Sequence, residues 1–270
     1  MAERTMVEAI NLALRQEMKR DDDVVVMGED VGVDGGIFRV TEGLLDEFGE
    51  GRVIDTPLAE SAIVGSAVGM AINGLRPVAE IQFSGFSYLA FSQIEAHAAR
   101  MRWRSQGRFG VSMVVRMPYG AGVRALEHHS ESREVYWAHT PGLKTVIPST
   151  PRTARALLVS AIRDPDPVIF MEPKQIYRSM REEVPDEEET LPIGGARRVR
   201  EGDGLTMVAW GAMLHRTLDA AETLSSEDRV EADVFDLATL APLDTGAIAE
   251  SVQRTGRLVV VHEAPMSFGP

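Results

Sequence analysis

The segment RVIDTPLAESAIVGSAVGMAI, residues 52–72, decides the fold class that we predict for this chain. The short apolar run at Val53 and Ile54 predicts a strand, and a turn containing proline follows it. Residues 59–72 are small and apolar, which predicts a buried helix that Gly74 ends. A strand, a turn and a buried helix in this order are typical of α/β proteins, and they place Glu60 near the helix start.

The same alternation continues on both sides of this segment. Helices are predicted at 5–20, where Thr5 and Glu8 form a capping box, at 41–49 with Thr41 as the cap, and at 86–104 and 151–163. Apolar strands are predicted at 24–27, 77–83, 113–116, 145–147 and 168–171. Strands that alternate with helices imply a parallel sheet covered on both faces.

An acidic stretch that contains proline divides the chain. Residues 181–191, REEVPDEEETL, lack apolar periodicity and predict an exposed linker. Further strands are predicted at 205–210, 232–235 and 258–261, and helices at 213–224 and 244–254. We therefore predict a first domain at 1–180, a linker at 181–195 and a smaller C-terminal α/β domain at 196–270. The chain ends soon after the last predicted strand, so we expect this domain to be incomplete, with an exposed sheet edge.

Composition narrows the classes of function. The net charge of −13 argues against binding to nucleic-acid phosphates. No apolar run approaches the ~20 residues of a membrane span, and the N-terminus has no secretion signal. The absence of cysteine excludes disulfides, thiol catalysis and cysteine-ligated metals. We expect a cytoplasmic protein without nucleic-acid or membrane partners.

Glu60 is the first candidate site residue. In parallel sheets covered by helices, ligands bind beyond the carboxyl ends of the strands, and Glu29, Glu60 and residues 82–86 fall at such ends. A glutamate beside so apolar a helix is costly to ionise unless it has a partner. The alternative is a glutamate that interacts only with the positive end of the helix dipole.

Two adjacent histidines follow the strand predicted at 113–116. His128 and His129 point in different directions, which disfavours a shared metal, because metal pairs on a helix need a spacing of about four. They are either one buried, hydrogen-bonded histidine and one surface histidine, or they provide a single histidine that acts in a site through its charge or proton. Nearby aromatic side chains are either core residues or a platform for a flat heterocycle, namely Phe83, Phe86, Tyr88 and Phe91.

Several common catalytic motifs are missing from the sequence. No G-x-G-x-x-G follows the first strand, no G-x-x-x-x-G-K-[ST] loop occurs, and no serine lies in a nucleophile elbow. Hydride transfer, phosphoryl transfer and serine hydrolysis therefore lose support.

Long stretches of the chain resemble one family. They are VVVMGEDVG at 24–32, GRVIDTPLAESAIVGSAVGMAINGLRPVAEIQF at 51–83, EHHSES at 127–132, HTPGLKTVIPSTPRTARALLVSAIRDPDPVIFMEPKQIYR at 139–178, IGGARRVREGDGLTMVAWG at 193–211 and VVVHEAP at 259–265. In these stretches the chain resembles the β subunit of the decarboxylating component of 2-oxo acid dehydrogenase complexes, of pyruvate or branched-chain type. The resemblance implies a transketolase-like pyrimidine-binding domain and a smaller C-terminal domain.

The resemblance also implies a cofactor, thiamine diphosphate, and roles for individual residues. Glu60 would hydrogen-bond the pyrimidine ring nitrogen and favour the imino tautomer, whose nitrogen takes the proton of the thiazolium carbon. Phe86 would stack on the pyrimidine, with Phe83 and Leu58 nearby. His129, rather than His128, would steady the intermediate and help pass the acyl group to lipoamide, and Glu29 would lie between paired sites.

A structural potassium site of the family matches Met113, Ala161, Asp164 and Asp166, the last in place of the usual asparagine. Two further departures from the family are visible. Many relatives have Gln-Phe-Ala-Asp-Tyr where this chain has Gln82-Phe83-Ser84-Gly85-Phe86. The final ~50 or more residues expected of the family are also missing, which puts docking onto the acyltransferase core in doubt.

The magnesium motif of thiamine diphosphate enzymes is incomplete. Gly202-Asp203-Gly204 matches its opening, but both asparagines, Asn11 and Asn73, lie upstream, so we interpret 202–204 as a turn. We therefore expect an α subunit to hold the diphosphate and Mg²⁺ in an α2β2 assembly that serves a lipoyl-bearing acyltransferase core. Alternatives are a β-type subunit of a split transketolase or acetoin dehydrogenase, and a non-catalytic scaffold or regulatory subunit. The particular 2-oxo acid is not predicted.

Overall fold

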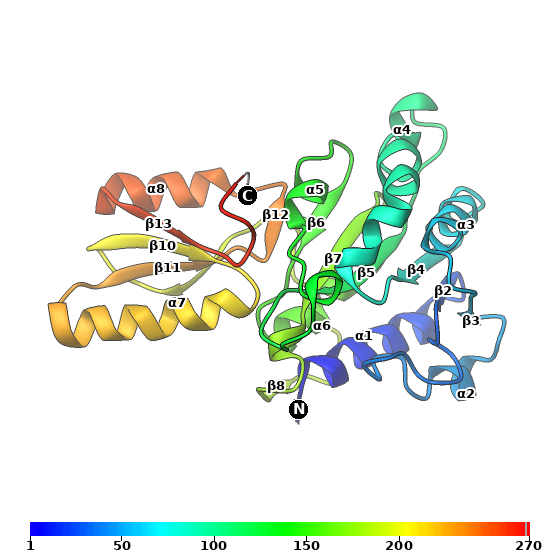
Figure 1. The fold of residues 1–270 in the computed structure, drawn as a ribbon, viewed down its shortest axis with the longest axis horizontal. Coiled ribbons are helices and arrows are strands. Elements are labelled where there is room, and N and C mark those ends of the chain that lie inside the picture. The colour runs from blue at the N-terminus through cyan, green and yellow to red at the C-terminus, as the bar shows by residue number, and fades with distance from the viewer. Residues whose placement is uncertain (268) are drawn as a thin grey trace.

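A seven-stranded sheet forms the centre of the larger part of the molecule (Figure 1). The computed structural model describes residues 1–267 and 269–270. The strand order is β12-β6-β7-β5-β4-β2-β3, and all neighbours are parallel except β12, which pairs antiparallel with β6. Their bounds are β2 (Val24–Gly28), β3 (Val53–Asp55), β4 (Arg76–Glu80), β5 (Val114–Tyr119), β6 (Lys144–Val146), β7 (Val168–Pro173) and β12 (Thr239–Ala241).

Two apolar layers cover this sheet, as the alternation of strands and helices predicts. In β2, Val24 and Val26 pack with α1 (Met6–Arg20) and α6 (Pro151–Arg163), whereas Met27 packs with α3 (Glu60–Ile72) on the other face. Successive strand residues point to opposite faces, so one strand supplies both cores. The capping box that we predicted at Thr5 and Glu8 is present at the start of α1.

The C-terminal part contains a second, four-stranded sheet of order β13-β10-β11-β9. Helices α7 (Ala212–Thr223) and α8 (Thr245–Thr255) lie on its two faces (Figure 1). The strands are β9 (Arg197–Arg200), β10 (Leu205–Ala209), β11 (Ala232–Asp236) and β13 (Leu258–Val261). The exposed edge that we expected is β13, because Leu258, Val259 and Val260 are each more than 40% exposed.

The structure differs from prediction in one connection and adds a strand that we did not predict. The segment predicted as an exposed linker contains β8 (Glu182–Val184), which pairs with β1 (Ala2–Arg4) and buries Val184. The sequence near residue 183 does not reveal this strand, because its antiparallel partner lies 180 residues away in the chain. The strand that we did not predict is β12, which leaves the C-terminal part and joins the first sheet beside β6.

Three element boundaries also differ from prediction. Thr41 does not cap a helix, because its hydroxyl donates to the carbonyl of Val31, and α2 (Leu44–Phe48) begins after Gly43. The strand predicted at 77–83 ends at Glu80. The helix predicted at 86–104 divides into a 3₁₀ segment η1 (Ser84–Ala90), a π segment η2 (Gln93–Ala98) and α4 (Met101–Arg104). In η1 the Ser87 hydroxyl bonds the Ser84 carbonyl, a local bond that competes with regular helix.

The remaining short elements are α5 (Glu134–Ala138) and the single turns η3 (Glu127–His129), η4 (Lys174–Ile176) and η5 (Leu224–Asp228). Within the described part of the chain, no helix is both long and apolar enough to cross a bilayer.

Candidate functional site

The carboxyl ends of β2, β3 and β4 meet at one edge of the large sheet. Glu29 directly follows β2, Asp55 ends β3 just before α3, and Ile81 follows β4. Because β2 pairs in parallel with both β3 and β4, these ends are adjacent. The prediction that Glu29, Glu60 and residues 82–86 share this edge is confirmed.

Glu60 is the first residue of α3 and is only 4% exposed. Its helix packs through Ile63, Val64 and Ala67 into the apolar core. Among the described residues, its carboxylate has no side-chain hydrogen bond and no ion pair. The helix dipole offsets only part of the cost of burying a carboxylate. This site therefore fits a ligand atom that shares a hydrogen with residue 60.

Glu29 lies in the same acidic surroundings. Burial raises the pKa of Glu29, and the negative charges of Glu60, Asp30 and Glu80 raise it further. A raised pKa favours the neutral acid, which repels a nearby carboxylate less than an ionised group would. Glu29 and Glu60 are therefore close enough for the charge of one to affect the other.

Three of the predicted residues form one aromatic cluster. The His129 ring lies 4.2 Å from Phe83 and 5.5 Å from Phe86 between centroids, in edge-to-face geometry. The rings of Phe83 and Phe86 are 5.7 Å apart. His129 is half-buried, and within the described residues its ring nitrogens have no hydrogen-bond partner, whereas His128 is exposed. The arrangement matches a single histidine that faces a site better than it matches a buried, hydrogen-bonded one.

Leu58 is not part of this cluster. Its side chain is 78% exposed in the turn between β3 and α3. Tyr88 is also exposed, and Phe91 packs against Trp137.

The loop that carries His129 is held in place by η1. The Ser84 hydroxyl donates to the Glu131 carbonyl at 2.8 Å. Gly85 packs against the backbone of His128 so closely that a Cβ would clash with that carbonyl oxygen. Ser84 and Gly85 therefore act together, one by a hydrogen bond and one by the absence of a side chain.

Lys174 is a site residue that the sequence did not indicate to us. It follows β7, is 5% exposed, and donates to the Gly120 carbonyl at 2.8 Å. Its ammonium lies 5.8 Å above the Phe83 ring. Burial lowers the pKa of Lys174 to about 8, while the charge of Glu263 opposes this shift. The strand-end rule that located Glu29 also applies to Lys174 and could have found it.

A buried charge network crosses the sheet beside these residues. Arg116 on β5 donates to both carboxylate oxygens of Glu172 at 2.7 Å and also pairs with Glu80, and the Tyr177 hydroxyl bonds Glu172. Burial raises the pKa of Glu80. Glu80 and Glu172 share Arg116 as their cationic partner, which fixes β4, β5 and β7 relative to one another.

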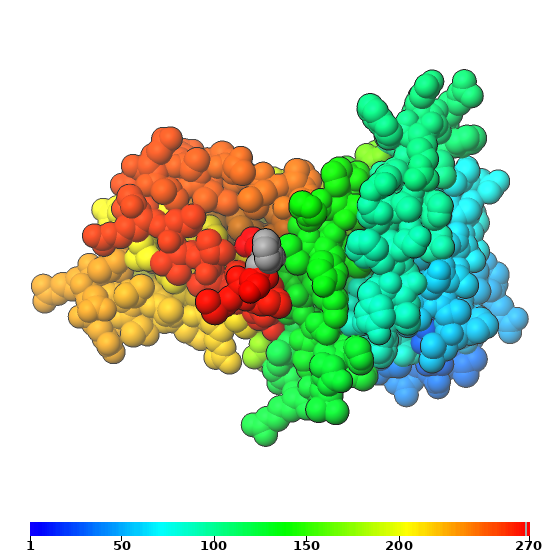
Figure 2. All heavy atoms as spheres, turned by 45° about the horizontal axis from the view of Figure 1, so that its top comes forward, coloured from blue at the N-terminus to red at the C-terminus, as the bar shows by residue number. Residues whose placement is uncertain are grey.

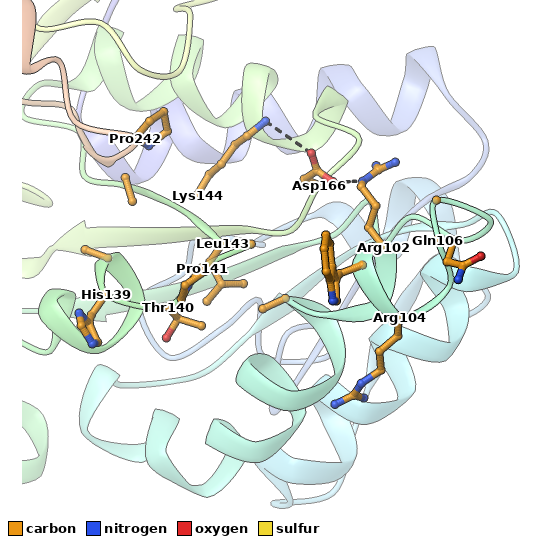
Figure 3. A pocket seen from close by; sticks show the side chains of 16 residues that line it. Arg102, Arg104, Gln106, His139, Thr140, Pro141, Leu143, Lys144, Asp166 and Pro242 are labelled. Atoms are coloured by element: carbon orange, nitrogen blue, oxygen red, sulfur yellow. Dashed lines mark hydrogen bonds and ion pairs between the residues drawn. The ribbon is translucent and has the colours of Figure 1, made fainter.

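The side chains of the predicted potassium site are paired with cations. Lys144 donates to both carboxylate oxygens of Asp164 at 2.7 Å. Asp166 accepts a hydrogen bond from Arg102 and also forms an ion pair with Lys144 at 4.0 Å (Figure 3). The carbonyls of Met113 and Ala161 accept backbone N–H groups. Among the described residues, no three His, Asp or Glu side chains are placed to hold a metal. Asp166 lies in the wall of a hollow of about 1220 Å³ that Trp103 and Pro141 also line, and this hollow includes neither Glu60 nor His129.

Comparison with known proteins identifies the family. Residues 2–180 match the family model described as "Transketolase, pyrimidine binding domain", and residues 194–270 match "Transketolase, C-terminal domain". The pyruvate dehydrogenase E1 component subunit beta of Acholeplasma laidlawii is 54% identical over 270 residues, which are 100% of this chain and 82% of that protein. The protein of the same name in Bacillus subtilis (strain 168) is 52% identical over 269 residues, with the same coverage. The chain belongs to this transketolase-like E1 β family.

Solved structures of more distant proteins share the fold of the family. A split-gene transketolase, described as an inactive β4 tetramer, superimposes with a TM-score of 0.80 at 21% identity, over 97% of this chain and 81% of that one. A transketolase from Pichia stipitis gives 0.74 at 15% identity, over 99% of this chain and 40% of that one. The predicted fold class is confirmed.

Proposed function

We propose that this chain is the β subunit of a thiamine diphosphate-dependent 2-oxo acid dehydrogenase, and that Glu60 activates the aminopyrimidine of the cofactor. The buried, unpartnered carboxylate at the start of α3 carries this proposal. Two relatives, at 54% and 50% identity, are each named as a pyruvate dehydrogenase E1 component subunit beta. These names favour the pyruvate type in our proposal over the branched-chain type.

The residues at the sheet edge fit the pyrimidine half of the cofactor. Glu60 needs a hydrogen-bond partner, and a ring nitrogen provides one. The rings of Phe83 and Phe86 offer apolar surface for a flat heterocycle, although Leu58 projects away from them. When bound, the cofactor supplies the carbon nucleophile and the electron sink for loss of carbon dioxide.

Protein groups then hold and move protons. Glu60 gives or takes a proton at the pyrimidine nitrogen, and Glu29, with its raised pKa, limits the negative charge beside it. His129 presents its imidazole from the loop above Phe83, where it can donate a hydrogen bond to the reacting acyl group. By this account Glu60 and His129 are catalytic, and Glu29 supports Glu60.

The other half of the cofactor requires a partner chain. Gly202 packs against the backbone of Glu231 and Ala232 in the turn before β10, which supports the interpretation of residues 202–204 as a structural turn. We infer that an α subunit holds the diphosphate and Mg²⁺ in an α2β2 complex, and that the acyl group passes to lipoamide on an acyltransferase core.

Two smaller proposals accompany this one. Carbonyl oxygens keep a second lone pair, so those of Met113, Ala161 and Asp164, with Asp166, could still bind K⁺. An unfolding midpoint that is equal in KCl and NaCl would argue against this site.

We also place the protein in the cytoplasm, and recovery in the membrane or secreted fraction would contradict that location.

The split site is tested by comparing the chain alone with the assembled complex. We expect the chain alone to show no turnover of pyruvate when it is titrated with thiamine diphosphate and Mg²⁺, and addition of the α subunit to restore activity. Tight cofactor binding and turnover by the isolated chain would falsify the split site. Product analysis with pyruvate, branched-chain 2-oxo acids and sugar phosphates separates this function from acetoin cleavage and ketol transfer. An inactive complex would support the scaffold alternative.

A further inference from the structure

One peptide group at the base of the His129 loop is held from both domains. The Gly120 carbonyl accepts a hydrogen bond from the buried ammonium of Lys174 at 2.8 Å. The Ala121 N–H, which belongs to the same peptide group, donates to the Glu263 carboxylate at 2.8 Å. A cation therefore lies at the negative end of the peptide dipole and an anion at its positive end, which makes both hydrogen bonds charge-assisted.

The backbone conformation and the close contact at residue 120 both favour glycine. Gly120 has a φ of +88°, and a Cβ at this position would lie 2.7 Å from Oε1 of Glu263. Figure 2 shows the red C-terminal residues in contact with the green segment that contains this loop. The C-terminal domain therefore reaches the backbone of the site domain at one defined peptide.

The adjacent peptide group, between Tyr119 and Gly120, closes the loop that carries His129. The Gly120 N–H donates to the Glu131 carbonyl at 2.9 Å, so residues 120 and 131 form the base of the loop. The Lys174 ammonium also lies above Phe83, whose ring contacts His129. A shift of the Gly120–Ala121 peptide would therefore move His129 in two ways. It would displace the loop backbone, and through Lys174 it would displace the Phe83 ring that His129 contacts.

Neighbouring contacts fix Glu263 itself. The His262 ring stacks on Trp210, with centroids 5.3 Å apart and planes within 7°. The Trp210 indole donates at 3.2 Å to Glu134, which begins α5 shortly after the loop. The C-terminal domain therefore contacts the chain on both sides of His129.

We propose that Glu263 is a positioning residue, and that together with Lys174 it clamps the Gly120–Ala121 peptide and so orients His129. The clamp is a property of this chain alone, whereas its effect on catalysis rests on the proposed function. Through this clamp, the C-terminal domain helps to position the proposed active-site residue His129.

The first test is limited trypsin digestion of the full chain. Arg124 lies in the exposed part of the loop, so the fragment that ends there reports loop opening. We expect Glu263→Ala to release this fragment roughly tenfold faster than wild type, as loss of a charged hydrogen bond allows. Glu263→Gln keeps an acceptor oxygen and should restore most of the protection. The control is Glu201→Ala, an exposed glutamate of the same domain.

Equal cleavage of wild type, Glu263→Ala and Glu201→Ala would overturn the clamp. Should Glu263→Ala fail to fold, hydrogen exchange in the wild-type chain decides the question. The Ala121 amide is expected to exchange at least about tenfold more slowly than the amide of exposed Ala125. Equal exchange rates would equally overturn the proposal.

The catalytic consequence is measured separately in the complex with the α subunit. If the clamp orients His129, Glu263→Ala lowers kcat more than it raises KM for the 2-oxo acid, and Glu263→Gln recovers most of kcat. An unchanged kcat despite faster cleavage would show that the clamp does not orient His129. A wild-type complex without any activity would refute the proposed function and leave the trypsin result to decide the clamp.

Discussion

Glu60 and Glu29 have similar side chains but different surroundings. Glu60 begins a helix and lacks a protein partner among the described residues, whereas burial and three nearby carboxylates raise the pKa of Glu29. A neighbour whose pKa is raised repels Glu60 less than an ordinary carboxylate would, which suits a group that we propose exchanges a proton with a ligand. The helix start fixes Glu60 in position, which a loop residue would not achieve as well.

Replacing Glu60 with glutamine tests its role directly. Glutamine has nearly the same shape but cannot exchange the proton, so Glu60→Gln in the assembled complex should lower pyruvate decarboxylation by ~10²–10⁴. Gel filtration should show an unchanged assembly. The exposed Glu50→Gln serves as the matched control and should retain full activity. A Glu60→Gln complex that keeps more than about a tenth of the rate would be incompatible with this role.

At the scale of elements, the site depends on the contact between η1 and the turn η3. Ser84 donates a hydrogen bond to the loop, and Gly85 allows the His128 backbone to approach η1. The small side chains of Ser84 and Gly85 therefore allow the loop backbone to pack directly on η1. This contact carries Phe83, Phe86 and His129 into one cluster.

Adding one methyl group at position 85 should open this contact. In Gly85→Ala the new Cβ meets the His128 carbonyl, so we expect a loss of about 1–3 kcal/mol in urea unfolding and a lower kcat in the complex. The control is Gly69→Ala in α3, where a Cβ meets nothing within 4 Å. That variant should gain up to about 1 kcal/mol from helix propensity. Equal stability of Gly85→Ala and wild type would show that η1 and η3 are not tightly packed.

The sequence predicted those elements whose signals are local. Apolar runs located β2, β3 and β7, and the capping box located α1, because each depends on neighbouring residues. The strand-end rule then placed Glu29 and Glu60 at one edge. The 3₁₀ and π segments between 84 and 98 could not be predicted, since a helical pattern does not reveal contacts that distort the helix.

Contacts between residues that are far apart in the chain could not be predicted, for a different reason. Lys174 contacts Gly120, Ser84 contacts Glu131, and Glu263 contacts Ala121, across 47 to 142 positions. The strand-end rule can place such residues at the edge of a sheet, but no local pattern identifies their distant partners. The pairing of β12 with the first sheet is hidden in the same way.

At the scale of the whole molecule, a buried carboxylate joins the two domains. Asp236 ends β11 of the C-terminal domain, is fully buried, and accepts a hydrogen bond from Ser149 of the first domain at 2.6 Å. Burial raises the pKa of Asp236 to about 6, although the hydrogen bond from Ser149 and the charge of Arg197 oppose the rise. The interface therefore contains a group that titrates at mildly acidic pH.

This shift predicts how the stability of the interface depends on pH. Between the ordinary pKa of 3.8 and the raised value of about 6, the folded state binds the proton more tightly, so the contribution of Asp236 to stability falls as pH rises. Asp236→Asn removes this dependence. Measured by urea unfolding, the stability of Asp236→Asn relative to wild type should therefore increase by about 2 kcal/mol from pH 4.5 to pH 7. Asp203→Asn, an exposed position in the same domain, should show no such change. A relative stability of Asp236→Asn that stays constant or falls over this range would mean that burial at the interface does not control the charge of Asp236.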